Sequence, residues 1–142
     1  MKKIFYIMIM LFCPLFVFSA GSVKQNKVTV EITQVKSAEG KIYLCIYDSA
    51  KSYDKKISYK EFCIEPKIGT VIFETELPDG EYVFSLCHDT NGNGNLDTGL
   101  FGIPKEPIAM SNYDGKSIPG NFKRHRIQIN ADSKITLKVL KF

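Results

Sequence analysis

Residues 77–97 read LPDGEYVFSLCHDTNGNGNLD, and this stretch determines how the rest of the chain is interpreted. The tetrapeptide at residues 77–80 is a strong turn signal. Residues 81–87 then alternate between two faces, which predicts a β-strand. The strand runs directly into residues 89–97, where an oxygen-bearing side chain recurs at every second position. The stretch therefore predicts a β-protein with a specialised loop at the end of one strand.

Short alternating segments separated by turn signals occupy the chain on both sides of this stretch. Residues 48–59 are polar, and we expect a long loop there with room for a short helical turn. Residues 130–133 look like a hairpin connection between the last two strands. This pattern predicts an all-β fold, a single antiparallel β-sandwich of about seven strands. The expected strands are residues 28–33, 42–47, 62–65, 70–77, 81–87, 124–130 and 135–142.

The first residues have the layout of a secretory signal peptide. Lys2 and Lys3 precede an apolar run at residues 4–18, and small residues follow at 19–21. We predict a signal peptide over residues 1–20, cleaved within residues 19–21, and a β-sandwich domain over residues 27–142. The protein is therefore expected to be exported, to the periplasm or to the outside of the cell. No later stretch is long and apolar enough to predict a membrane span.

Charge and cysteine content narrow the function classes further. Without Lys2 and Lys3 the chain keeps 17 of its 19 Lys and Arg residues against 15 Asp and Glu, which is too little basic excess for a nucleic-acid-binding protein. The basic cluster at residues 123–126 is expected to be the solvated face of a strand. Three cysteines, Cys45, Cys63 and Cys87, would be exported, which allows at most one intramolecular disulfide and leaves the pairing open.

The spacing of residues 89–97 is that of a calcium-binding loop. Asp89, Asn91 and Asn93 occupy the first three ligand positions of such a loop. Asn95 would offer its backbone carbonyl, and Asp97 would bind directly or through water. The sequence thus predicts a calcium site on a loop that follows a strand.

The loop differs from an EF-hand in its last ligand. Leu100 stands where an EF-hand has a bidentate carboxylate, and no helix is expected on either side. Glu106 is the nearest later carboxylate, and we expect Gly102 and Pro104 to fold it back as the missing ligand. Leu96 is expected to anchor the loop to the core. With so few charged ligands, calcium affinity is expected to be weak, about 10⁻⁴–10⁻³ M.

The alternative interpretation of the loop is purely structural. Asn91-Gly92 and Asn93-Gly94 would then be turn formers, with Asp89 and Asp97 as caps. The regular spacing of oxygens favours the metal site, because a bare turn needs only one Asn-Gly pair. His88 is expected to be a hydrogen-bonded structural residue. His125 is expected to be partly buried on the same strand face as residues 127 and 129.

Four motifs occur in order along the domain: LPxGxY at residues 77–82, HDxNxNGxLD at 88–97, GIPKEP at 102–107 and SN at 111–112. With these motifs, the chain from about residue 27 to its end resembles the bacterial exported domains catalogued as domain of unknown function 2141. The resemblance implies a sandwich of the transthyretin-like or carboxypeptidase-regulatory type. It implies no activity.

Two functions of different classes follow from these observations. The first is a non-catalytic exported module, stabilised by calcium, that interacts with a protein or another component of the cell envelope. The second is a metal-assisted hydrolase of carbohydrate or phosphate substrates. It would require His88, Asp89, Asp97 and Glu106 to meet in an open pocket. We favour the first, because the sequence contains no nucleophile constellation.

Overall fold

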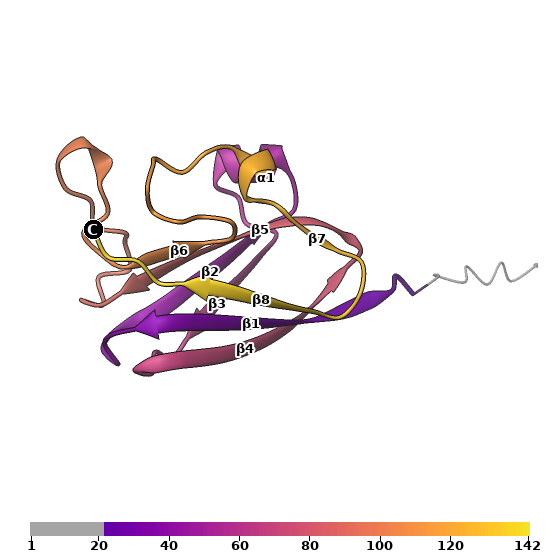
Figure 1. Ribbon diagram of the computed structural model, residues 1–142, viewed down its shortest axis with the longest axis horizontal. Helices are drawn as coiled ribbons and strands as arrows, with labels where there is room; N and C mark the ends of the chain where they lie inside the picture. The colour runs from indigo at the N-terminus through magenta and orange to yellow at the C-terminus, as the bar shows by residue number, and fades with distance from the viewer. Residues whose placement is uncertain (1–21) are drawn as a thin grey trace, which may run out of the picture.

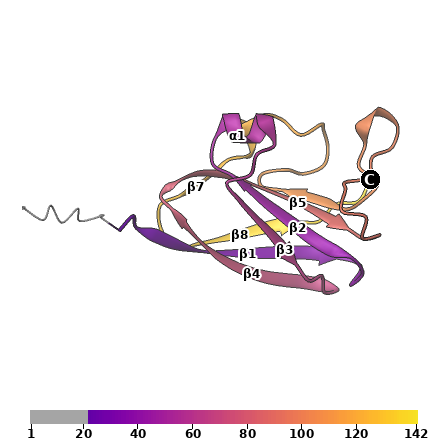
Figure 2. The same cartoon turned by 180° about the vertical axis from the view of Figure 1, so that it is seen from behind.

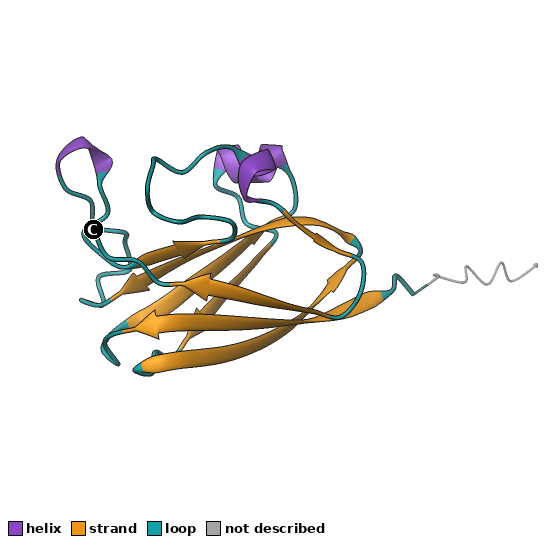
Figure 3. Ribbon diagram, viewed as in Figure 1, coloured by secondary structure: helices purple, strands orange, loops and turns teal. Residues whose placement is uncertain are grey.

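The computed structural model describes residues 22–142, which form two layers of β-strands with the helical turns on one side (Figures 1 and 3). The predicted signal peptide lies outside these residues. No helix within residues 22–142 is both long and apolar enough to cross a membrane. The elements are β1 (Gln25–Val35), β2 (Lys41–Tyr47), α1 (Ala50–Lys55), β3 (Lys60–Ile64), β4 (Gly69–Pro78), β5 (Gly80–Asp89), the short 3-10 helix η1 (Leu100–Gly102), β6 (Ile108–Met110), α2 (Phe122–His125), β7 (Ile127–Ile129) and β8 (Ser133–Lys138).

The strands form two sheets that face each other across the core. The smaller sheet has the order β4-β1-β8, and the larger has the order β3-β2-β5-β6, with β7 pairing the other end of β5. Every pair is antiparallel except β1 and β8, which run parallel. The predicted all-β sandwich is therefore confirmed. The three-residue strand β6 was not predicted.

The core follows from the two-residue period of the central strands. In β1, Val28, Val30 and Ile32 point inward and are fully buried. They pack in one cluster with inward residues of the other sheet, among them Leu44 of β2 and Phe84 of β5. Burying a side chain of this size contributes about 1.5–3 kcal/mol. The alternation in sequence thus determines which face of each sheet points inward. With the sheets oriented in this way, the loop that follows β5 begins at one end of the sandwich.

Two helical turns cover part of the outer face of the larger sheet. Ser49 caps α1 by accepting from the Ser52 N–H (3.2 Å), and Ser52 in turn caps the Ser49 N–H, a reciprocal capping box. The helix buries Tyr53, which packs with Phe122 of α2 and with Val83 on the outer face of β5. Residues 48–59 therefore contain the short helical turn for which the sequence left room.

The segment before β7 differs from the prediction. Residues 122–125 form α2 rather than a strand, so the basic cluster at residues 123–126 is not a strand face. His125 is fully buried in this helical turn, and it is not on a strand face with residues 127 and 129. Its Nε2 accepts from the Gly120 N–H (2.8 Å) and its Nδ1 donates to the Ser111 carbonyl (3.1 Å). These backbone partners hold the segment in a turn that its sequence pattern does not reveal.

The predicted hairpin between the last two strands is also wrong. β7 pairs with β5 in the larger sheet, whereas β8 pairs with β1 in the smaller one. The chain crosses the sandwich at residues 130–132, where Asp132 accepts from the Lys27 N–H (2.8 Å). Crossing lets Ile129 and Ile135 enter the same core from opposite sheets, which a hairpin within one sheet would not achieve.

Candidate functional site

The loop between β5 and β6, residues 90–107, stands at one end of the sandwich beside the C-terminus (Figure 2). We refer to it as the 90–107 loop. Its two arms are joined by backbone hydrogen bonds: the Lys105 N–H donates to the Asp97 carbonyl (2.8 Å) and the Gly99 N–H to the Ile103 carbonyl (2.7 Å). The arms also meet at an isolated bridge between residues 98 and 104. The loop is therefore an ordered element, with η1 at its tip.

Asp89, at the end of β5, organises the first turn of the loop from inside. The residue is 1% exposed, and Oδ1 accepts from the N–H groups of Gly92 (2.7 Å) and Asn93 (3.2 Å) while Oδ2 accepts from the N–H of Gly94 (2.8 Å). Gly92 and Gly94 have φ of +72° and +76°, which favours glycine. Burial alone would raise the pKa of Asp89. The surrounding backbone amides outweigh burial and hold the pKa below its ordinary value.

Glu106 accepts backbone hydrogen bonds near both ends of the 89–97 stretch. Its Oε1 accepts from the Thr90 N–H (3.0 Å) and its Oε2 from the Asp97 N–H (3.2 Å), and the residue is 4% exposed. The Cys87 Sγ lies 3.9 Å from Oε2. Glu106 thus folds back beneath the loop, where its carboxylate binds backbone amides.

The exposed side of the loop gathers three more of the predicted ligands. Asp97 Oδ2 accepts from Asn91 Nδ2 (2.6 Å), and Asn93 Nδ2 lies 3.1 Å from both carboxylate oxygens. The Asn91 Oδ1 accepts from the Asn93 N–H (3.0 Å), and the Asn93 Oδ1 from the Asn95 N–H (2.8 Å). Asn91 and Asn93 are exposed and Asp97 is partly buried, and we call these three residues the outer trio.

The six predicted ligands therefore fall into two layers. Asp89 and Glu106 are buried, whereas the outer trio is more accessible and Asn95 is exposed. Across residues 22–142, no three His, Cys, Asp or Glu side chains are grouped so that they could hold a metal ion. A metal here would also need amide and carbonyl oxygens. Leu96 is 45% exposed, so the expectation that it anchors the loop to the core is wrong.

All three cysteines of the domain are free and lie on the outer face of the larger sheet. Cys63 is exposed, whereas Cys45 and Cys87 are partly buried in a hollow of about 430 Å³ beneath the loops. Burial, with Glu61 nearby, raises the pKa of Cys45. Burial and then the neighbouring Glu106 raise the pKa of Cys87 to about 12. Such thiols stay protonated and are poor nucleophiles.

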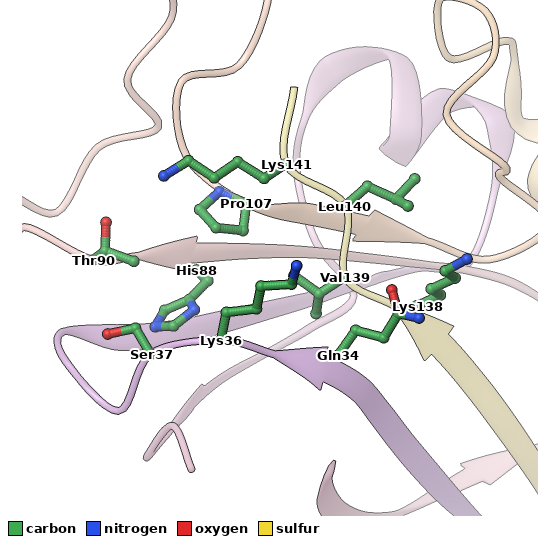
Figure 4. Close-up of a pocket in the computed structure, with 10 residues that line it drawn as sticks. All are labelled: Gln34, Lys36, Ser37, His88, Thr90, Pro107, Lys138, Val139, Leu140 and Lys141. Carbon is green, nitrogen blue, oxygen red and sulfur yellow. The ribbon is translucent and has the colours of Figure 1, made fainter. Parts of the chain in front are cut away.

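A groove of about 440 Å³ lies at the root of the 90–107 loop, between the ends of β1, β5 and β8 (Figure 4). The side chains of Lys36, Lys138 and Lys141 line it, together with His88. The His88 Nε2 donates to the Glu39 carbonyl (2.8 Å), so His88 has the structural role expected of it. The sequence did not reveal this groove, because its lysines come from opposite ends of the domain. The only local signal is the density of lysine in residues 134–141.

No curated protein and no solved structure matched the chain. One family model did match, over residues 30–137, which is more than half of the chain and includes part or all of every strand and the whole 90–107 loop. The motifs quoted from residues 77–112 lie inside that match. The chain therefore belongs to the bacterial family described as "Uncharacterized protein conserved in bacteria (DUF2141)".

Proposed function

We propose that the protein is an exported, non-catalytic module whose 90–107 loop binds one calcium ion and which acts by interaction at the cell envelope. Export is inferred from the signal-peptide pattern of residues 1–20, and the envelope role from export together with membership of a bacterial family. The calcium site is inferred from the loop itself. Asn91, Asn93, Asp97 and the Asn95 carbonyl would contact the ion, and Asp89 and Glu106 would supply the remaining negative charge.

The observation that supports this proposal is that the loop concentrates negative charge without a positively charged side chain, in the described part of the chain, to neutralise it. Asp89, Asp97 and Glu106 all belong to one loop system, and none of them takes part in an ion pair recorded among residues 22–142. Each carboxylate accepts from amides instead. Amide donors satisfy hydrogen bonding but do not neutralise charge. A divalent cation would do so and would relieve the repulsion within the loop.

Calcium would enter by replacing the two side-chain amide donors at Asp97. Rotation of the Asn91 and Asn93 side chains would bring their oxygens toward the ion, since an amide carries an acceptor beside its donor. It would also release the N–H groups of Asn93 and Asn95, from which those oxygens accept. The backbone around Asp89 would remain in place, because that carboxylate is held by three N–H groups. The loop would therefore bind the ion by rearranging side chains rather than by refolding.

The experiment is a thermal melt of the protein with and without calcium. A ligand that binds only the folded state raises the melting temperature, and about 2.7 kcal/mol is gained at a hundred times the dissociation constant. We expect a rise at millimolar calcium and a smaller one with magnesium, which demands tighter octahedral geometry. Asp97→Asn should abolish the rise.

The matched control is Asp54→Asn, because Asp54 is an exposed carboxylate on α1, outside the loop. This variant should keep the full calcium effect although its charge change is the same. If millimolar calcium leaves the melting temperature of the unmodified protein unchanged, or if both variants respond equally, the proposed calcium site is wrong.

The hydrolase alternative has less geometric support. His88 lines the lysine groove, whereas Asp89 lies beside a different hollow on the other face of β5. The oxygens of Asp89 and Glu106 bind the backbone of the loop rather than pointing together into a pocket. We therefore assign no catalytic role to His88, Asp89, Asp97 and Glu106.

A further inference from the structure

The tip of the 90–107 loop exposes apolar side chains next to one another. Phe101 is 99% exposed, Leu100 84% and Ile103 51%. Phe101 has φ of +60°, a conformation that a bulky residue adopts only when its surroundings impose it. Isolated exposed apolar residues are ordinary, but a group of them on one projection indicates a surface that is covered in use. The tip is therefore built to meet apolar surroundings.

The shape of the tip favours a lipid layer over a protein partner. It projects from the end of the sandwich in both views (Figures 1 and 2). A protein partner would need a matching pocket for it, whereas a fluid lipid layer admits a projecting apolar tip directly. Lys105 and Phe142 share a shallow hollow with the base of the tip. Apolar side chains with a basic residue close behind them are typical of segments that insert at a membrane interface.

The lysine groove adds a charge argument at the same end of the molecule. Lys36, Lys138 and Lys141 form no ion pair and no side-chain hydrogen bond with any residue from 22 to 142, and neither Asp nor Glu lines the groove. Their ammonium groups are spread along it rather than gathered at one point (Figure 4). A layer of anionic headgroups matches this spread better than a single small anion does. Near an anionic surface, each basic residue raises affinity about fivefold.

We propose that this end of the sandwich docks on an anionic lipid surface, with the tip at Leu100–Phe101 inserted and the lysines of the groove on the headgroups. Two independent features carry the proposal, the exposed apolar tip and the unpaired lysines, and they lie at the tip and at the root of the same loop. The proposal does not rest on calcium binding, and it would give the module a stated target at the envelope.

The first experiment uses the fact that the chain contains no tryptophan. Phe101→Trp places a single fluorescent reporter at the tip. Mixed phosphatidylglycerol–phosphatidylcholine vesicles should shift its emission to shorter wavelength, because the indole leaves water. The control is Ile72→Trp, whose site on β4 is also exposed but lies away from the loop. That reporter should not shift.

The second experiment measures sedimentation of the protein with the same vesicles. Changing both Leu100 and Phe101 to serine should weaken binding about tenfold or more, given the apolar area that insertion buries. Replacing Lys36, Lys138 and Lys141 together by glutamine should also weaken it at least tenfold. The matched control replaces Lys51, Lys55 and Lys67, which are exposed elsewhere, and carries the same net charge. It should bind as the unmodified protein does.

Four results would overturn the proposal. The first is that the protein does not bind anionic vesicles, whether calcium or EDTA is present, and the second is that it binds pure phosphatidylcholine vesicles equally well. The third is that the two triple-lysine variants lose binding equally. The fourth is that millimolar inorganic phosphate releases the protein from the vesicles. The last would identify the groove as a site for free phosphate. Unchanged melting temperatures in the variants would show that any loss arises at the surface and not from unfolding.

Discussion

At the scale of single residues, Asp89 is the side chain on which the shape of the loop depends. Three backbone N–H groups converge on its carboxylate, and they hold its pKa below the ordinary value despite burial. A lowered pKa in the folded state means that the charged form stabilises the fold. This contribution is fully present above the ordinary carboxyl pKa of about 4 and is lost as the pH falls through the folded value.

We therefore expect the cost of Asp89→Asn to depend on pH. At neutral pH the variant should unfold more easily, because an amide presents only one acceptor oxygen to the N–H groups that the carboxylate binds. As the pH falls below about 4 and then through the lowered pKa of folded Asp89, the aspartate becomes protonated and the two proteins should converge in free energy of unfolding. Urea titrations from acid to neutral pH measure this difference. A difference that stays constant over the whole range would show that the charge of Asp89 contributes nothing.

At the scale of elements, the end of β5 rests on the turn between β1 and β2. Gly40 has φ of +71°, and a Cβ atom there would lie 1.8 Å from the Asp89 carbonyl oxygen. Gly40→Ala must push the two segments apart, and we expect a loss of about 2–4 kcal/mol. The control is Gly69→Ala, where φ is +99° but nothing lies within 4 Å. It should cost only the conformational term, about 1–2 kcal/mol. Equal losses in urea titrations would mean that this contact is unimportant.

The elements that the sequence predicted well are those whose burial follows a local period. The alternation in β1 and β5 predicted both strands correctly and divided their side chains between two faces. The partners of β7 and β8 were predicted wrongly because the choice of partner strand depends on the opposite sheet. The local sequence of residues 130–133 is compatible both with a hairpin and with a crossing between the sheets. The turn at α2 was missed for a related reason, since His125 is held by Ser111 and Gly120 through the backbone.

The same distinction applies to the candidate site. Sequence spacing identified the oxygen-bearing residues of the loop, and it brought Glu106 into consideration from outside the motif. It could not separate Asp89 and Glu106, which bind backbone amides, from Asn91, Asn93 and Asp97, which face outward. That separation depends on where the chain turns at its glycines. Nor could it predict the lysine groove, whose members meet only after β1 and β8 pair in parallel.

At the scale of the whole molecule, the sandwich is held by its core and its strand pairing, without a disulfide between any of Cys45, Cys63 and Cys87. A disulfide would typically contribute about 2–4 kcal/mol. Reductant is therefore expected to change the melting temperature by less than about 1 °C, where loss of such a bond would lower it by several degrees.

The three thiols should also differ in reactivity. Near pH 8, Cys63 is expected to react quickly with a thiol reagent, because it is exposed. Cys87 should react very slowly, because burial and Glu106 raise its pKa to about 12 and leave almost no thiolate. Cys63→Ser should remove the fast phase, and unfolding in urea should make the buried thiols react at the rate of Cys63. A fast phase that survives Cys63→Ser would place a reactive thiolate in the hollow beneath the loops, and the sheet there would have to be more open than the structure has it.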